Sequence, residues 1–206
     1  MTSHADENRG RAASLAAAAL CFLLLAASAP GPLAQDGAQG GEPRAREVPN
    51  FHQVNARLYR GGQPRPGGMR ELAARGVNTV INLRDDDERA SAEEGEARAA
   101  GLRYFNVPLG RLGRPADEQV ARVLSLIDAP ENGVVFVHCA KGQDRTGTVI
   151  AIYRITHDRW TGERAKKEAE HYGMKFWQRG MKDYIEDYYR DRAPREKPAG
   201  PERRAP

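Results

Sequence analysis

The sequence predicts an α/β domain of three layers, in which helices flank a central mixed or parallel sheet. Short apolar segments typical of strands alternate along the chain with longer amphipathic segments typical of helices. One short segment, Gly133–His138, is apolar almost throughout, as expected of a strand that is covered on both faces. The length of 206 residues, with 40% hydrophobic and 29% charged residues, fits one such domain with extensions at its ends.

The elements before this central strand follow in order. Strands are predicted where β-branched and aromatic residues gather, at 57–62, 77–83 and 102–109. Helices are predicted around 69–75 and over 90–101, the second closed by Gly101. A third helix is predicted after Pro115, a favourable first helical residue, with acidic residues in its first turn. Its apolar stripe has the spacing i, i+3, i+4, i+7 and consists of Val120, Val123, Leu124 and Ile127.

Three helices are predicted after the central strand. The first, 146–158, is apolar on most faces and should be buried. Two further helices are expected at 162–173 and 181–191. The core side of the last is marked by Met181, Tyr184, Ile185 and Tyr188.

The two ends of the chain do not read as part of the domain. Residues 1–29 combine a polar, arginine-containing start with the uncharged run 12–29, which is typical of a secretory signal peptide. The alternative is an uncleaved N-terminal anchor, because the run is near the roughly 18-residue limit for spanning a bilayer. Either way the protein is expected to be exported, periplasmic or secreted. Residues 30–47 are predicted to be a flexible linker, 48–192 the folded domain and 193–206 a disordered tail.

Charge and cysteine content narrow the possible partners. The net charge of +4 is modest and mixed along the chain, so nucleic acid is not an expected partner, and at most a mild preference for anions follows. Without the leader, Cys139 is the only cysteine, which excludes an internal disulfide and a cysteine zinc site. Single histidines at 52, 157 and 171 have no metal-ligand spacing.

The stretch His138–Gly147, HCAKGQDRTG, joins the central strand to the predicted buried helix. A loop in this setting presents backbone N–H groups at a helix N-terminus and so forms an anion site, while Gly142 permits a tight turn. Arg145 adds a planar guanidinium that fits two phosphate oxygens. Cys139, in the same positive field, should be a thiolate that attacks a bound phosphoryl group without metal or cofactor.

The pattern His-Cys-x5-Arg-Thr-Gly resembles the signature of the cysteine-dependent tyrosine and dual-specificity phosphatases. The resemblance implies a tyrosine-phosphatase-like fold in which Cys139 is the phosphocysteine nucleophile and Arg145 binds phosphate. It also implies that Thr146 stabilises the thiolate as leaving group and that His138 supports the loop. The other loop residues implied to bind substrate are Ala140, Lys141, Gly142, Gln143 and Gly147.

Two further stretches, Asn50–Pro64 and Tyr172–Ile185, resemble the bacterial, plant and fungal atypical dual-specificity phosphatases. With them, the resemblance spans nearly all of 48–192. Some plant and fungal relatives act on inositol pyrophosphates. The resemblance therefore implies a phosphorylated protein or a phosphorylated small molecule, such as an inositol phosphate, as the partner.

The sequence departs from the pattern of these enzymes at the general acid. The region where an aspartate is expected, Asn106–Pro115, contains no carboxylate. Asp144 is one candidate, because myotubularin-type lipid phosphatases place an aspartate at this position, but it can equally hold the loop by accepting N–H bonds. Asp117 is another candidate, although it fits a helix start. A third possibility is that no acid is needed, since a phosphate leaving group, with a second pKa of about 6, departs more readily than a phenoxide at about 10.

The sequence thus predicts a phosphatase that hydrolyses phosphomonoesters, phosphotyrosine or phosphoserine/threonine in protein, through a phosphocysteine intermediate. One alternative is an inositol polyphosphate or pyrophosphate phosphatase with the same mechanism. Another is a catalytically weak phosphate-binding module. A sulfurtransferase of the rhodanese kind is disfavoured by the arginine spacing and the Thr-Gly ending. Basic residues that could contact the rest of a substrate are Lys141, Lys175, Arg179, Arg111 and Arg114, and for all except Lys141 a solvated surface charge is the favoured alternative.

Overall fold

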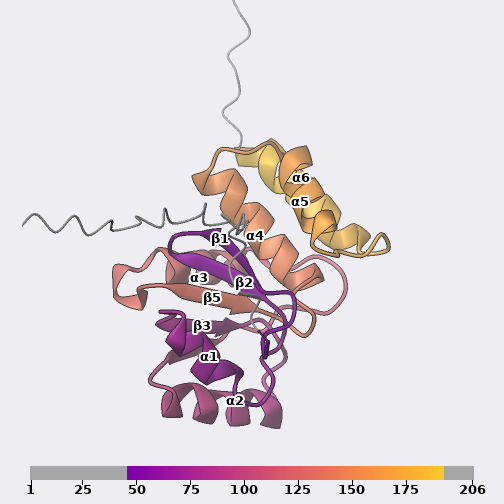
Figure 1. Cartoon of the computed structure of the whole chain (residues 1–206). Coiled ribbons are helices and arrows are strands. Elements are labelled where there is room, and N and C mark those ends of the chain that lie inside the picture. Colours follow the sequence, from indigo (N-terminus) through magenta and orange to yellow (C-terminus); the bar gives the residue numbers. More distant parts are fainter. Residues whose placement is uncertain (1–45, 193–206) are drawn as a thin grey trace, which may run out of the picture. The chain divides into compact units, whose positions relative to one another are not determined.

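A computed structural model of the chain describes residues 46–192 (Figure 1). Within this range the strands form one five-stranded sheet in the order β1-β2-β5-β3-β4. The outer strand β1 runs antiparallel to β2, and the other neighbours are parallel. The predicted mixed sheet is therefore confirmed. The strands are β1 (His52–Asn55), β2 (Leu58–Gly61), β3 (Thr79–Asn82), β4 (Arg103–Asn106) and β5 (Val135–His138).

Helices cover both faces of the sheet, which gives the three predicted layers (Figure 1). Helices α1 and α2 pack on one face. Helices α3 and α4 pack on the other, and α5 and α6 pack against α4. The helices are α1 (Gly68–Ala74), α2 (Glu88–Ala99), α3 (Asp117–Asp128), α4 (Asp144–His157), α5 (Gly162–His171) and α6 (Arg179–Arg192), with a 3-10 turn, η1 (Pro130–Asn132).

The central strand β5 shows how the sheet divides the core. Val135 and Val137 contact the cluster that includes the apolar side of α3 and α4. Phe136, between them in sequence, contacts the cluster beneath α1 and α2. All three side chains are fully buried, as the alternation of side chains along a strand requires when both faces are covered.

Most predicted elements are confirmed, and three details differ. Strand β1 was not predicted, because its sequence HQVN is polar and its side chains are only partly buried at the sheet edge. The turn η1 was also not predicted. Pro115 does not occupy the first helical position. It precedes the N-cap residue Ala116, whose N–H donates to the Gln119 side chain at 3.0 Å.

The predicted leader, the tail and most of the linker lie outside the described residues. The last two linker residues are held by the fold, because the backbone N–H groups of Arg46 and Glu47 donate to the Glu71 carboxylate at 3.1 and 2.9 Å. Between residues 46 and 192, none of the helices has the length and apolar character needed to cross a bilayer.

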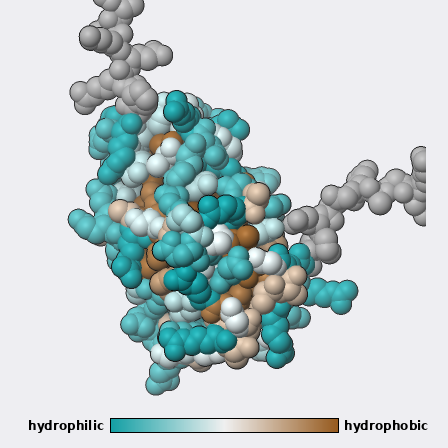
Figure 2. Space-filling model, turned by 90° about the vertical axis from the view of Figure 1, so that its left-hand side faces the viewer, coloured by the Kyte–Doolittle hydropathy of each residue, from teal (hydrophilic) through white to brown (hydrophobic). Residues whose placement is uncertain are grey.

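Hydrophilic residues cover most of the surface seen in Figure 2, and hydrophobic residues appear there in small separate areas. Over the described residues, three large hydrophobic side chains are notably exposed: Leu112, Phe176 and Trp177. Two of these, Leu112 and Trp177, belong to the pocket described next.

Candidate active site

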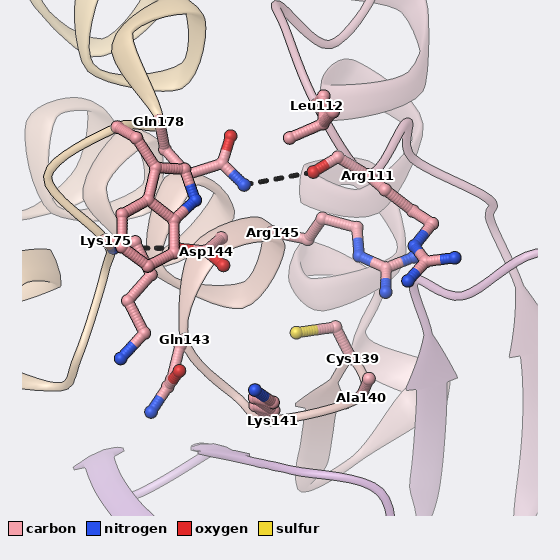
Figure 3. A pocket seen from close by; sticks show the side chains of 11 residues that line it. Arg111, Leu112, Cys139, Ala140, Lys141, Gln143, Asp144, Arg145, Lys175 and Gln178 are labelled. Carbon is pink, nitrogen blue, oxygen red and sulfur yellow. Dashed lines mark hydrogen bonds between the residues drawn. The ribbon is translucent and has the colours of Figure 1, made fainter.

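The loop between β5 and α4 forms the floor of a pocket of about 440 Å³ (Figure 3). Of the ten predicted site residues, six line the pocket: Cys139, Ala140, Lys141, Gln143, Asp144 and Arg145. The other four are buried behind its wall: His138, Gly142, Thr146 and Gly147. The rest of the lining comes from two distant segments and consists of Arg111, Leu112, Lys175, Trp177 and Gln178.

Cys139 is the nucleophile candidate, and its surroundings favour the thiolate. The side chain is 3% exposed. Burial alone would raise the thiol's pKa, but hydrogen bonds from the Thr146 hydroxyl and backbone N–H outweigh this effect, together with the positive charge of Arg145 and the Lys141 N–H. The pKa of Cys139 is therefore lowered. The Thr146 side chain is fully buried, so water does not compete for its hydroxyl group.

Arg145 is fixed with its guanidinium beside the sulfur (Figure 3). Its Nη1 donates to the backbone carbonyl of Leu83 at 3.1 Å and to that of Leu109 at 3.4 Å. These carbonyls follow β3 and β4, so the sheet itself orients the guanidinium. The group is 7% exposed and lines the pocket, and it is thereby positioned to bind the equatorial oxygens of a phosphoryl group.

His138 lies beneath the loop in a buried polar network. Its Nε2 is 2.9 Å from Oε1 of Glu93, which projects from α2. The other oxygen of Glu93 accepts hydrogen bonds from Asn82 Nδ2 at 2.9 Å and the Tyr104 hydroxyl at 3.2 Å. Burial raises the pKa of Glu93, but the interaction with His138 and the hydrogen bonds from Gln63 and Tyr104 together outweigh it, so the pKa is lowered. This network holds the end of β5 against β3, β4 and α2.

The two candidate acids lie in different settings. Asp144 lines the pocket at the start of α4, and its Oδ1 accepts the backbone N–H of Lys175 at 2.8 Å. One carboxylate oxygen thus holds the loop to the segment between α5 and α6. Asp117 is not a pocket-lining residue. It faces Tyr184 on α6, where burial and the Asp117 carboxylate raise the tyrosine's pKa.

The predicted basic residues divide in a similar way. Lys141, Lys175 and Arg111 line the pocket. Arg114 instead forms an ion pair with Asp187 at 2.6 Å. Arg179 begins α6 and is not among the lining residues.

Sequence reasoning missed several residues that build the site. Glu93 supports His138 from a helix whose sequence predicts only an exposed acidic face. Gln178, which is 4% exposed, donates from Nε2 to the Arg111 carbonyl at 3.0 Å and so joins the two segments above the loop. Asn50 and Arg60 contact the rear of the loop. The resemblance of 50–64 and 172–185 to known phosphatases was the one signal pointing to these segments.

Comparison with known proteins identifies the family. The family described as DSP-PTPase phosphatase fused to NAD+ kinase matches residues 43–185. The dual specificity protein phosphatase TpbA of two Pseudomonas aeruginosa strains is 32% and 31% identical over 126 and 164 residues. These alignments cover 61% and 79% of this chain, and 55% and 71% of the respective TpbA sequences. An Arabidopsis thaliana protein named inositol diphosphatase DSP5 is 25% identical over 68% of this chain and 70% of its own length.

Solved structures agree with this assignment. The crystal structure of P. aeruginosa TpbA is 27% identical, with a TM-score of 0.57, and the match covers 67% of this chain and 84% of that one. The catalytic core of the Saccharomyces cerevisiae PP-IP phosphatase Siw14, at 21% identity and a TM-score of 0.61, shows the same fold over 68% of this chain and 85% of its own. With a thiolate-stabilising loop built on this fold, the chain belongs to the atypical dual-specificity phosphatases of the cysteine-dependent tyrosine phosphatase superfamily.

Proposed function

We propose that this chain dephosphorylates protein, with phosphotyrosine as its preferred residue, through a phosphocysteine intermediate on Cys139. The observation that carries the proposal is the lowered pKa of Cys139 at the floor of a pocket that Arg145 also lines. A thiolate so placed is a nucleophile at neutral pH, and the guanidinium binds the group that it attacks.

The proposed reaction proceeds in two displacement steps at phosphorus, with the phosphocysteine as the intermediate. In the first, Cys139 Sγ forms a bond to phosphorus while the bond from phosphorus to the tyrosine oxygen breaks, and that oxygen takes a proton from Asp144 or from water. In the second, water attacks phosphorus and gives its proton to the same acceptor, the S–P bond breaks, and inorganic phosphate and the Cys139 thiolate form. Arg145 and the loop N–H groups bind the phosphoryl oxygens in both steps, and the Thr146 hydroxyl stabilises the departing thiolate.

The rim of the pocket supports an aromatic substrate. Leu112 is 73% exposed and Trp177 is 56% exposed, and both line the pocket above the loop. A phenyl ring between the loop and these side chains would bury apolar surface, which a serine or threonine side chain provides less of. A crystal structure of a TpbA cysteine-to-serine variant in complex with phosphotyrosine, 27% identical to this chain, supports the same choice.

The test is turnover of phosphopeptides by the full chain. We expect phosphate release from a phosphotyrosine peptide to exceed that from phosphoserine and phosphothreonine peptides of matched sequence. Cys139→Ser should abolish release, because the hydroxyl is not ionised at neutral pH, while tungstate binding persists. Binding without hydrolysis by the wild-type chain would contradict the proposal and support a phosphate-binding module.

A second candidate function is hydrolysis of inositol pyrophosphates. Lys141, Lys175 and Arg111 line the pocket and provide positive charge for further phosphates. The expected acid segment, 106–115, has no carboxylate, which matters less for a phosphate leaving group. The relative DSP5, named an inositol diphosphatase, supports this candidate.

One variant separates the two candidates. Lys175→Ala should raise KM for an inositol pyrophosphate severalfold and leave KM for a phosphotyrosine peptide nearly unchanged, because only the multiply charged substrate extends to this residue. Lys167→Ala, on the surface of α5 and paired with Glu163, is the matched control. Failure of the wild-type chain to hydrolyse the pyrophosphate would exclude the second candidate.

The proposal includes an exported location. The support is the polar start and uncharged run within residues 1–29, which lie outside the described part. Fractionation of cells that produce the full chain tests this location, and N-terminal sequencing of the exported protein distinguishes a cleaved signal peptide from an uncleaved anchor.

A further inference from the structure

The carbonyl groups at the tip of the phosphate-binding loop are held from behind by the segment that contains β1 and β2. The Ala140 carbonyl accepts the backbone N–H of Gln63 at 3.2 Å. The next carbonyl, of Lys141, accepts Asn50 Nδ2 at 3.2 Å. The contacts come from a stretch of chain that lies far from the loop in sequence.

The third carbonyl in the row, that of Gly142, has two donors. Asn50 Nδ2 lies 3.0 Å from it and Arg60 Nη2 lies 2.9 Å from it. The loop packs directly on the end of β2, since a Cβ on Gly142 would lie 2.4 Å from the Gly61 carbonyl oxygen. Gly142 also has a positive φ of 68°, which a larger side chain would strain.

Because peptide groups are planar, the direction of these carbonyl groups also determines the direction of the N–H groups of the loop. In a trans peptide, the N–H of a residue points away from the carbonyl of the preceding residue. If the carbonyls of 140, 141 and 142 point to the rear, the N–H groups of Lys141, Gly142 and Gln143 point to the pocket side. The Lys141 N–H does so, because it is one of the groups that stabilise the Cys139 thiolate.

Asn50 is arranged specifically for this contact. Its φ is 52°, in the left-handed region that a non-glycine residue rarely occupies. Its Oδ1 lies 3.0 Å from His52 Nε2, which leaves Nδ2 directed at the loop. Nδ2 also lies 3.2 Å from the carbonyl of Tyr172, which precedes the segment carrying Lys175. One amide group thus joins the loop to the opposite wall of the pocket.

Arg60 is a buried cation in the same place. Its side chain is 1% exposed, and its guanidinium lies 4.3 Å from the centre of the Tyr172 ring. Burial lowers its pKa to about 10, an effect that Glu168, Tyr172 and the Cys139 thiolate partly offset. Nε and Nη1 are buried without a hydrogen-bond partner among residues 46–192. Burying a charge in this way costs stability, so its place behind the loop indicates a role in the site.

We propose that Asn50 and Arg60 are positioning residues for catalysis, which hold the Lys141 and Gly142 carbonyls to the rear so that the loop N–H groups face the phosphate. Neither side chain touches the substrate. The inference rests on the phosphate-binding loop of the proposed function but on no particular substrate.

The experiment measures oxyanion binding and thiolate formation in folded variants of the full chain. Asn50→Gly removes the amide and tolerates the positive φ, and Arg60→Met removes the guanidinium. We expect each to weaken tungstate binding roughly tenfold, as loss of aligned donors at an anion site does. The midpoint of Cys139 alkylation by iodoacetamide should move to higher pH, and kcat should fall more than KM rises.

Conservative variants and a control distinguish positioning from general stability. Arg60→Lys keeps the charge and should lose less than Arg60→Met, whereas Asn50→Asp keeps the shape, loses the donors and should lose more than Asn50→Gly. Gln53→Ala, on the same strand as His52 but in contact with Tyr59, should behave as wild type. Melting curves define the temperature at which each variant is folded.

Unchanged tungstate affinity and alkylation midpoint in folded Asn50→Gly and Arg60→Met would overturn the inference. If Arg60→Met does not fold, Asn50→Gly and Asn50→Asp decide, because Asn50 contacts the same Gly142 carbonyl. Neither readout needs turnover. A wild-type chain that bound tungstate but hydrolysed no phosphopeptide would contradict the proposed function, while the variants would still test the inference.

Discussion

Thr146 contributes a single hydroxyl to the site, and this hydroxyl interacts with the Cys139 sulfur, the proposed nucleophile. It donates to the Cys139 sulfur, and it is fully buried on the first turns of α4. A hydrogen bond to the thiolate favours the charged form, so its removal raises the thiol's pKa.

For Thr146→Val we expect the pKa of Cys139 to rise by about one unit, the equivalent of one hydrogen bond to a charged group. The acidic limb of kcat/KM should shift to higher pH by the same amount, because thiolate is then formed only at higher pH. Alkylation of the Cys139-containing peptide, followed against pH by mass spectrometry, measures the shift. Thr156→Val, at the far end of α4 with its hydroxyl bonded to Ile152, should leave the midpoint in place.

Asp144 is expected to combine two tasks at one residue. Its Oδ1 holds the Lys175 N–H, and its carboxylate lines the pocket, where a proton can reach a leaving oxygen. As a general acid it matters more for a poor leaving group.

We therefore expect Asp144→Asn to reduce kcat on phenyl phosphate at least tenfold more than on an activated aryl phosphate. Steady-state kinetics on the two substrates measure the difference. Equal losses on both substrates would show that Asp144 is not the general acid and that it acts only by binding the Lys175 N–H.

At this scale the sequence predicts the residues that lie next to one another in the loop, since HCAKGQDRTG contains the nucleophile and its immediate partners. It does not predict partners contributed by distant segments. Arg60 and Gly142 are 82 residues apart, and Asn82 and Glu93 lie on different elements. Nothing in the local pattern of a polar residue states which distant group it will contact.

At the scale of elements, the close contact between the loop and β2 decides how the loop is held. Gly61 and Gly142 meet backbone to backbone, and neither position has room for a side chain. Gly76, at the end of α1, has a similarly positive φ of 82° but open space around its Cβ position.

Gly142 and Gly76 allow a matched comparison, because both have a positive φ but only Gly142 is in close contact with other atoms. Gly142→Ala should lower kcat/KM at least 100-fold, because a Cβ only 2.4 Å from the Gly61 carbonyl forces the loop to move. Gly76→Ala should cost about 1 kcal/mol of stability from its φ and leave activity unchanged. Kinetics and urea unfolding of both variants provide the check, and near-normal activity in Gly142→Ala would show that the loop adapts.

The elements themselves are largely predictable from periodicity, as β5 and α3 show. Strand β1 is the exception, because an edge strand buries little and needs no apolar alternation. Its position matters all the same, since it begins two residues after Asn50, and its first residue, His52, contacts the Asn50 side chain. Apolar alternation in a sequence indicates a strand that is buried. Strand β1 is polar and partly exposed, and it is held by its backbone pairing with β2, so this pattern does not reveal it.

For the whole molecule, the buried pair of Glu93 and His138 joins the α2 layer to the sheet and to the active loop. The carboxylate is 5% exposed and contacts side chains from β3, β4 and β5. Its lowered pKa means that the ionised form is favoured by folding.

Glu93→Gln should reduce the free energy of unfolding by about 2–4 kcal/mol at neutral pH. The wild-type advantage is present above the unfolded pKa of about 4.3 and should disappear as pH falls through the lower folded value. Urea unfolding at pH 7 and in acid measures this difference. Glu94→Gln, which breaks only the surface pair with Arg98, should change stability by less than about 1 kcal/mol, and an equal effect of both variants would contradict the argument.

The three-layer arrangement is predictable because the order of strands and helices and the burial of each face follow from apolar spacing. The pocket is less predictable, because its walls come from two segments that are far apart in sequence, around Arg111 and around Lys175, which Gln178 joins by a hydrogen bond to the Arg111 carbonyl. The fold can therefore be predicted from the sequence more completely than the substrates that fit the pocket.

The contacts of Asn50 also constrain when the site can form during synthesis. Its side chain bonds to carbonyls 91, 92 and 122 residues downstream. A ribosome releases β1 and β2 well before the loop and Tyr172, and closing such long stretches of chain is a late, entropically costly event. Until these contacts form, the chain lacks the supported loop that stabilises the Cys139 thiolate, so the reactive form of the sulfur belongs to the nearly complete fold.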